Sequence, residues 1–248
     1  MNTGKMIRWK HIFRDDGKAV IVAMDHSMRR NVPGLENYLD TVKKVAAGGA
    51  DAILISYGNM VTLAKDLPRN LGYIISIPAP PRADFVEEAS IAGADGLKFT
   101  HFGSLTDANL NNLQPIAAAC EKYGILFMPE VVPQDDKRKT LYDQVASAAR
   151  LGQEAGGDFI KTAYTGSVAS FREVTNNCPI PVVILGGEKM DSDRELLQVV
   201  KECIEAGGAG TCMGRNVFQH KDPKAITAAI CKIVHDGSSV ESALKLVS

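Results

Sequence analysis

The 248-residue sequence lacks any long apolar run, any marked excess of charge of one sign and any closely spaced cysteine pair. No segment approaches the roughly 20 apolar residues that a membrane-spanning helix needs. The N-terminal stretch Met1–Lys10 has no apolar core of the kind found in secretory signals. With a formal net charge of −1, the composition gives no electrostatic reason to expect a nucleic acid or an anionic membrane as partner.

The five cysteines are odd in number and widely spread, and none forms a Cys-x-x-Cys motif. This pattern favours reduced thiols and predicts a cytoplasmic location. A metal site is disfavoured, because only His26 and His101 follow expected strands and a third ligand histidine is missing there. The other histidines, His11, His220 and His235, lie in expected helices or loops.

What the sequence does contain is a recurring joint of alanine and glycine that ends in aspartate. It stands at Ala47–Asp51, Ala92–Asp95 and Ala155–Asp158, and Ala206–Gly210 repeats it with glycine in place of the acid. Each joint follows a segment of helical character and precedes a short apolar run. Glycine just past a helix fits the left-handed C-terminal cap, so the joint predicts the same helix-to-strand turn four times.

Between these joints the chain divides into alternating strand and helix candidates, with no change in composition that would mark a second domain. Expected strands are 19–25, 51–56, 73–77, 96–100, 125–131, 159–163, 182–185 and 210–213. Expected helices are 35–47, 57–66, 83–92, 108–123, 137–155, 167–177, 191–206 and 223–235, with a terminal helix near 240–246. Such alternation is typical of a parallel sheet.

Eight units in one chain of this length predict an α/β fold, a single-domain (β/α)8 TIM barrel over residues 1–248. An open doubly wound sheet is disfavoured, since no GxGxxG motif follows the first strand. Residues 1–18 are then an N-terminal extension that closes the barrel bottom, and residues 238–248 form a C-terminal helix.

Lys161 lies in the middle of the short apolar run 159–163. Side chains alternate along a strand, so Lys161 shares a face with Phe159 and Ala163. If that face points into the barrel, burial disfavours the ammonium and favours the nucleophilic amine that forms a Schiff base with a ketone. The alternative is a lysine at a strand end whose head reaches solvent.

Three further charged residues are expected on inward faces near the ends of strands, where barrel enzymes carry their chemistry: Asp25, Lys98 and Glu130. Lys98 is expected to lower the pKa of Lys161 further, as a second cation nearby does. Asp25 and Glu130 would offset the buried positive charge and transfer protons. A structural ion-pair network is the alternative, although it would add little stability for its burial.

Glycines and one arginine follow the last two expected strands, at Gly186, Gly187, Gly214 and Arg215. Glycine lets a phosphate approach backbone N–H groups, and a short helix starting near Arg215 would direct its positive end at the anion. The loops after the seventh and eighth strands are the usual phosphate site of this fold. The alternative is plain turn glycine. The lesser pocket candidates are His26, His101 and Ser104.

The motifs Met24–His26, Ile160–Thr162, Gly186–Gly187 and Gly214–Gln219 resemble the class I aldolases of the DeoC/LacD superfamily, most of all the archaeal-type fructose-bisphosphate aldolase branch. That branch also holds aminodideoxy-heptulosonate synthases and a thiolase of phosphorylated autoinducer-2. The resemblance implies a Schiff-base lysine at Lys161, an acid at Asp25 and a homo-oligomer, often a decamer.

The sequence departs from this branch after the fifth strand, where Met128–Pro133 replaces the family's Tyr-Pro-Arg-Gly stretch and its proton-donating tyrosine. Glu130 and Lys98 instead resemble the tagatose-bisphosphate and sulfofructose-phosphate aldolases. Tyr164 is a further candidate proton donor. The identity of the sugar therefore does not carry over from the resemblance.

The sequence thus predicts a class I aldolase that acts on a phosphorylated ketose or related ketone without an organic cofactor. Lys161 would form the Schiff base, with Glu130, Asp25 and Lys98 around it. The alternatives are a thiolase or aminodeoxy-heptulosonate-type synthase on the same scaffold, a non-covalent phosphosugar isomerase, and a non-catalytic phosphate-binding barrel.

Overall fold

The computed structural model describes residues 1–26, 32–78, 81–102, 107–132 and 139–247. Eight parallel strands pair in chain order, and β8 closes onto β1. The strands are β1 (Ala19–Ala23), β2 (Ala52–Ile55), β3 (Gly72–Ser76), β4 (Gly96–Phe102), β5 (Leu126–Val132), β6 (Ile160–Thr162), β7 (Val182–Leu185) and β8 (Gly210–Met213). The predicted (β/α)8 barrel is confirmed.

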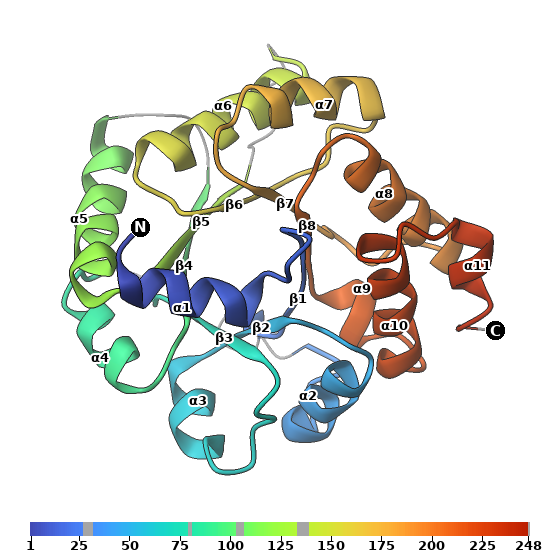
Figure 1. Cartoon of the computed structure of the whole chain (residues 1–248), viewed down its shortest axis with the longest axis horizontal. Helices are drawn as coiled ribbons and strands as arrows, with labels where there is room; N and C mark the ends of the chain where they lie inside the picture. The colour runs from blue at the N-terminus through green and yellow to red at the C-terminus, as the bar shows by residue number, and fades with distance from the viewer. Residues whose placement is uncertain (27–31, 79–80, 103–106, 133–138, 248) are drawn as a thin grey trace.

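Helices surround this barrel in the order that a right-handed strand-to-helix alternation requires (Figure 1). The helices of the described ranges are α1 (Thr3–Ile12), which precedes the first strand, and α2 (Tyr38–Ala47), α3 (Tyr57–Leu63), α4 (Phe85–Ile91), α5 (Asp107–Tyr123), α6 (Leu141–Glu154), α7 (Val168–Asn176), α8 (Asp193–Glu205), α9 (Arg215–Phe218), α10 (Pro223–Val234) and α11 (Val240–Leu244).

Most predicted ends lie within a few residues of the observed ones, and local capping explains the larger differences. The helix expected over 137–155 begins at Leu141, because Thr140 accepts from the backbone N–H of Asp143 while the Asp143 side chain accepts from Thr140 in a capping box. The helix expected over 35–47 begins at Tyr38, after the side chain of Asn37 caps it.

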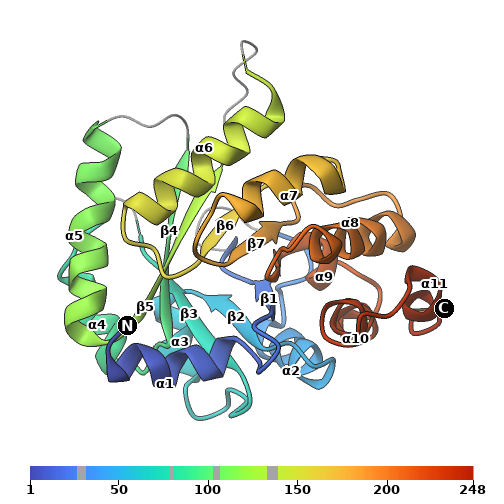
Figure 2. The ribbon, with the colours of Figure 1, turned by 45° about the horizontal axis from the view of Figure 1, so that its top comes forward.

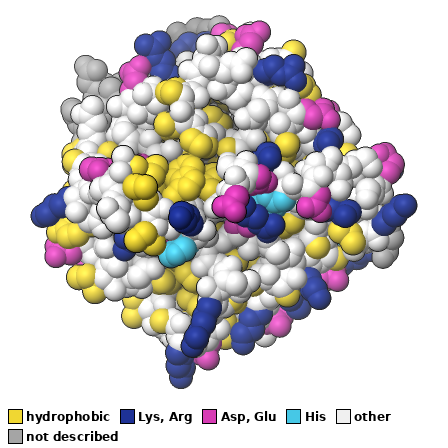
Figure 3. Space-filling model, viewed as in Figure 1, with side chains coloured by type: hydrophobic (Ala, Val, Ile, Leu, Met, Phe, Trp, Pro, Cys, Tyr) yellow, Lys and Arg dark blue, Asp and Glu magenta, His cyan; other side chains and the backbone are white. Residues whose placement is uncertain are grey.

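Buried apolar side chains form two layers, one inside the barrel and one between the barrel and its helices. Helix α1 lies across one end of the barrel (Figures 1 and 2). Trp9 and Phe13 stack with ring centroids 4.1 Å apart, and Phe13 meets Phe159 of the interior edge to face at 5.0 Å. The same view in space-filling form shows acidic and basic side chains interspersed over this end (Figure 3).

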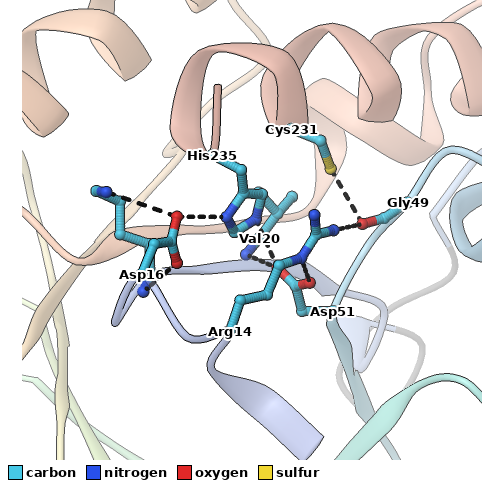
Figure 4. Close-up of polar contacts among 8 residues, drawn as sticks. Arg14, Asp16, Val20, Gly49, Asp51, Cys231 and His235 are labelled. Atoms are coloured by element: carbon cyan, nitrogen blue, oxygen red, sulfur yellow. Dashed lines mark hydrogen bonds and ion pairs between the residues drawn. The ribbon is translucent and has the colours of Figure 1, made fainter. Parts of the chain in front are cut away.

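The aspartates of the recurring joint connect the strands to α1 and the segment that follows it. The side chains of Asp51, Asp95 and Asp158 accept the backbone N–H of Val20, Tyr73 and Phe127, which lie on neighbouring strands. The same three carboxylates pair with Arg14 at 2.6 Å, His11 at 2.6 Å and Lys5 at 2.8 Å, respectively. Figure 4 shows the ion pair between Arg14 and Asp51. His235, which follows α10, contacts the same carboxylate through its Nε2 at 3.0 Å.

The fourth joint carries glycine because no side chain fits there. Gly210 has φ +120°, and a Cβ built on it would lie 1.9 Å from the carbonyl oxygen of Ala19. The missing aspartate of the pattern is therefore a consequence of how closely β8 approaches β1.

Candidate active site

Lys161 lies inside the barrel on β6 and is 5% exposed. Its neighbour in the parallel register is Glu130 of β5. The Nζ of Lys161 lies 2.5 Å from Oε1 of Glu130, a short charge-assisted contact. The lysine head is therefore buried and paired, and it does not extend from a strand end into solvent.

Lys98 of β4 joins the two acids that the sequence selected. Its Nζ donates to Oδ2 of Asp25 at 2.7 Å and to Oε2 of Glu130 at 3.1 Å. A third bond runs to the hydroxyl of Thr100 at 3.0 Å. The structure thus brings all four predicted residues into one cluster, because the inward faces of four strands converge at this end of the barrel.

Two hydroxyl groups complete the cluster, and neither was predicted from the sequence. Ser76, the last residue of β3, donates to Oδ2 of Asp25 at 2.6 Å. Thr100 donates to Oε2 of Glu130 at 2.6 Å. Strand alternation could have found Thr100, which follows Lys98 by two residues. Ser76 is identified only by its pairing with Lys98 in the register between strands.

The charges of the cluster keep both acids ionised. Burial raises the pKa of each carboxyl, but the two lysines lower it by more. The pKa of Glu130 falls to about 2, chiefly through Lys161 and then Lys98. The pKa of Asp25 lies well below its usual range, with Lys98 as the stronger cation. The cluster therefore holds two cations and two anions at neutral pH.

The prediction that Lys161 has a lowered pKa is wrong. Burial by itself lowers the pKa, but surrounding negative charge raises it above the usual 10.5, with Cys212, Glu130 and Asp25 as its sources. Burial raises the pKa of Cys212 to about 12, so at neutral pH it is an uncharged thiol and the two carboxylates are responsible. The positive charge of Lys98 was expected to lower the pKa of Lys161. That effect is offset because Lys98 lies between Asp25 and Glu130, whose negative charges act on Lys161 as well.

The predicted phosphate loops lie close together after β7 and β8. Arg215 forms an ion pair with Glu188 and donates to the carbonyl of Gly187 at 2.8 Å. Asn216, which was not predicted as a site residue, donates to the carbonyls of Gly186 at 3.0 Å and Glu188 at 3.1 Å. Its Oδ1 also accepts from the backbone of Met190 at 2.7 Å. Asn216 therefore holds the loop after β7 against α9.

Gly186 and Gly214 are positions where a side chain would collide. A Cβ on Gly186 would lie 2.9 Å from Nδ2 of Asn216, and one on Gly214 would lie 2.4 Å from Cε1 of His26. Gly187 has φ +60° and open space around it. Close packing explains the first two glycines, and backbone conformation explains the third.

His26 lies between the charged cluster and these loops. Its ring meets Phe218 edge to face at 5.2 Å, and its Nδ1 is 3.9 Å from Oδ1 of Asp25. Burial lowers the pKa of His26, so the ring is neutral at pH 7. His101 lies on β4 beside Val131 of β5. Ser104 lies outside the described residues.

Tyr164 does not point into the barrel, so the prediction that it could donate a proton there is wrong. Strand β6 ends at Thr162, and the hydroxyl of Tyr164 donates to Glu202 of α8 at 2.8 Å. The ring packs edge to face on Phe171 of α7 at 5.3 Å. Tyr164 thus belongs to the layer between barrel and helices.

Across the described ranges, no group of three or more His, Cys, Asp or Glu side chains is arranged to hold a metal ion. No helix in this part of the chain is long and apolar enough to cross a membrane.

Comparison with known proteins places the chain in a family. The sequence profile described as DeoC/LacD family aldolase matches residues 19–220. The 2-amino-3,7-dideoxy-D-threo-hept-6-ulosonate synthase of Halobacterium salinarum is 35% identical, covering 98% of this chain and 96% of that protein.

Two solved structures share the fold. An archaeal fructose 1,6-bisphosphate aldolase has a TM-score of 0.81 at 24% identity, covering 94% of this chain and 100% of that one. A second, with its catalytic lysine covalently bound to the carbinolamine intermediate of the substrate, has a TM-score of 0.80 at 24% identity, covering 93% and 99%. The sequence match over most of its length shows that this chain belongs to the DeoC/LacD family of aldolases, which are lyases.

Proposed function

We propose that the protein is a class I aldolase that makes or breaks a C–C bond next to the ketone of a phosphorylated ketose or related phosphorylated ketone. Lys161 forms the Schiff base. The observation that carries this proposal is the 2.5 Å contact between the buried Lys161 Nζ and Oε1 of Glu130. It provides a nucleophile and, within hydrogen-bond reach, the base that frees it.

The first step is the activation of Lys161. Its ammonium passes one proton to Glu130, a transfer that is uphill because the pKa of Lys161 is raised and that of Glu130 is about 2. The small fraction of free amine then attacks the carbonyl carbon to form a carbinolamine, which draws the transfer forward. Glu130 then returns the proton to the carbinolamine hydroxyl, which leaves as water and yields the iminium. The iminium carries the positive charge that the ammonium carried, so the buried cluster stays balanced throughout. This constancy matters because an uncompensated charge at this depth is costly.

In the second step, Asp25 takes the proton of the substrate hydroxyl on the carbon beyond the bond being cleaved. That bond breaks, its electron pair moves into the iminium, and an aldehyde leaves the resulting enamine. The enamine carbon takes up a proton and Asp25 gives up the one it received, so the acid is ionised again. The iminium formed is hydrolysed by the reverse of the first step. Lys98 keeps Asp25 and Glu130 ionised, since it lies within 3.1 Å of both.

The loops after β7 and β8 are the proposed phosphate site. Gly187 leaves its backbone open to an anion, and the Arg215 guanidinium lies beside it. A phosphate would compete with Glu188, whose side chain is 84% exposed, for the arginine. We therefore assign Arg215 to substrate binding and not to the bond-breaking step.

Two comparisons support Schiff-base chemistry without fixing the substrate. The solved aldolase with a carbinolamine on its lysine shares the fold. The 35% identity to the Halobacterium salinarum synthase favours a second candidate, in which this chain condenses rather than cleaves, as an aminodideoxy-heptulosonate synthase. Both candidates need the same lysine and differ in the substrates they accept. A cytoplasmic location and a homo-oligomer remain predictions from the sequence.

Borohydride trapping tests the proposal. Incubation with dihydroxyacetone phosphate and sodium borohydride should add a stable mass to the peptide that contains Lys161, while Lys161→Arg should give no adduct. An adduct on Lys98, or none on the wild-type chain, would overturn the assignment. Cleavage of fructose and tagatose bisphosphates, assayed beside formation of 2-amino-3,7-dideoxy-D-threo-hept-6-ulosonate, then separates aldolase from synthase.

A further inference from the structure

The two buried acids use their oxygens unequally. Oδ2 of Asp25 accepts from Ser76 at 2.6 Å and from Lys98 at 2.7 Å. Oε2 of Glu130 likewise accepts from Thr100 at 2.6 Å and from Lys98 at 3.1 Å. In each carboxylate, one hydroxyl and the shared ammonium thus hold the same oxygen, and the second oxygen points elsewhere.

The remaining oxygens face different partners. Oε1 of Glu130 faces the Lys161 amine at 2.5 Å. Oδ1 of Asp25 has no hydrogen bond to any residue that the structure describes, and its ion-pair contact is the distant Nδ1 of His26 at 3.9 Å. An oxygen atom about 2.8 Å from both Oδ1 and Nδ1 fits that separation. The buried Nδ1 has no hydrogen-bond partner in the described chain.

We propose that Ser76 is a positioning residue that fixes the orientation of Asp25, so that Oδ1 alone is presented to the substrate hydroxyl. The inference rests on the proposed function and deepens it. It divides the chemistry between the acids: Glu130, held by Thr100, works on the lysine, and Asp25, held by Ser76, works on the hydroxyl whose proton leaves as the C–C bond breaks.

A carboxylate needs such a holder, because the terminal torsion of aspartate is broad and nearly two-fold. Lys98 alone cannot provide it, since its three donor contacts are divided among Asp25, Glu130 and Thr100. Ser76 ends β3 directly opposite Lys98 in the register, and it is 3% exposed. Its hydroxyl and the ammonium therefore approach Oδ2 from adjacent strands, and water cannot readily replace the hydroxyl.

The substrate hydroxyl would then donate to Oδ1 and accept from the ring N–H of His26 when the neutral ring carries its proton on Nδ1. As the bond breaks, the proton passes to Asp25 and the oxygen becomes the carbonyl of the leaving aldehyde. The contact from His26 persists on that oxygen. No oxidant or further reactant enters this step.

Ser76→Ala and Thr100→Val form a matched pair for the test, since each removes one hydroxyl from one carboxylate. Borohydride trapping with dihydroxyacetone phosphate reports iminium formation, and turnover of the ketose bisphosphate that the wild-type enzyme cleaves fastest reports bond breaking. Ser76→Ala should trap at the wild-type rate with an unchanged KM, while kcat falls about tenfold, as expected for one lost hydrogen bond to a charged group. Thr100→Val should slow the trapping itself.

Further readouts separate positioning from mere structural support. Ser76→Thr, which keeps a hydroxyl, should restore kcat. In an Asp25→Asn background, Ser76→Ala should have no further effect. If Ser76→Ala does not fold, Ser76→Cys, with a weak donor of similar size, replaces it.

Unchanged cleavage in Ser76→Ala, or equal losses of trapping and cleavage, would overturn the role of Ser76. That result differs from failure of the proposed function, in which the wild-type chain itself gives no adduct on Lys161.

Discussion

Replacing Glu130 by glutamine should test the charge balance of the cluster most directly. The substitution keeps the shape of the side chain and removes one of two buried negative charges. Glu130 contacts Lys161 at 2.5 Å and Lys98 at 3.1 Å. At an effective dielectric constant near 20, the two contacts correspond to roughly 5 to 7 kcal/mol of attraction each, most of which offsets desolvation. The variant is left with two lysines and one acid.

We expect three consequences for Glu130→Gln. The free energy of unfolding should fall by about 3–5 kcal/mol, the usual cost of removing one partner from a buried ion pair. The pKa of Lys161 should fall, because the carboxylate closest to it is gone. Despite a larger fraction of free amine, turnover should drop by about 10² to 10⁴, since the base that moves protons for the Schiff base is missing.

Urea unfolding and the pH dependence of borohydride trapping measure these effects. The inflection of the trapping rate should move to lower pH than in the wild-type chain. Glu154→Gln is the matched control, because Glu154 pairs with Arg150 on the surface of α6 and its loss should cost about 0.5 kcal/mol or less. Wild-type stability together with an unmoved inflection in Glu130→Gln would refute the charge-balance reasoning.

Three further predictions concern the rest of the molecule. Both ring nitrogens of His235 contact carboxylates, and the pKa of His235 is raised. Its contribution to stability should therefore be complete below about pH 6.5 and be lost as the pH rises through the folded-state pKa. An NMR titration of the ring, together with urea unfolding at several pH values, checks this, and a normal pKa would contradict it. Gly210→Ala should lower the urea midpoint of unfolding sharply, since the added Cβ would collide with the carbonyl oxygen of Ala19. Gly58→Ala, where a Cβ on α3 meets open space, should instead raise the free energy of unfolding by about 0.5–1 kcal/mol. Equal midpoints for the two variants would disprove the steric argument. Arg215→Ala should raise KM for a phosphorylated substrate with little change in kcat, and a KM equal to wild type would show that the phosphate binds elsewhere.

Much of the barrel could be read from local patterns. The eight apolar runs, the alanine–glycine joints and the alternation of side chains along each strand are properties of short segments, and they predicted the strand count and the inward direction of Lys161 and Lys98. Strand and helix ends were less accurate where a cap decided them, as at Thr140. The ion pairs of the joint aspartates with Lys5, His11 and Arg14 depend on where α1 and the segment after it pack on the barrel, and no single segment of the sequence predicts them.

By itself, the sequence determined the fold class, the family and which charged residues lie at the open end of the barrel, because residue spacing along a strand sets the face of each side chain. Only the tertiary structure decided the protonation state of Lys161, the engagement of Arg215 by Glu188 and the outward direction of Tyr164. A pKa depends on the sum of charges brought together from several strands, and that sum has no counterpart in local sequence. The selection of Ser76 as a partner of Asp25 likewise required the register between neighbouring strands.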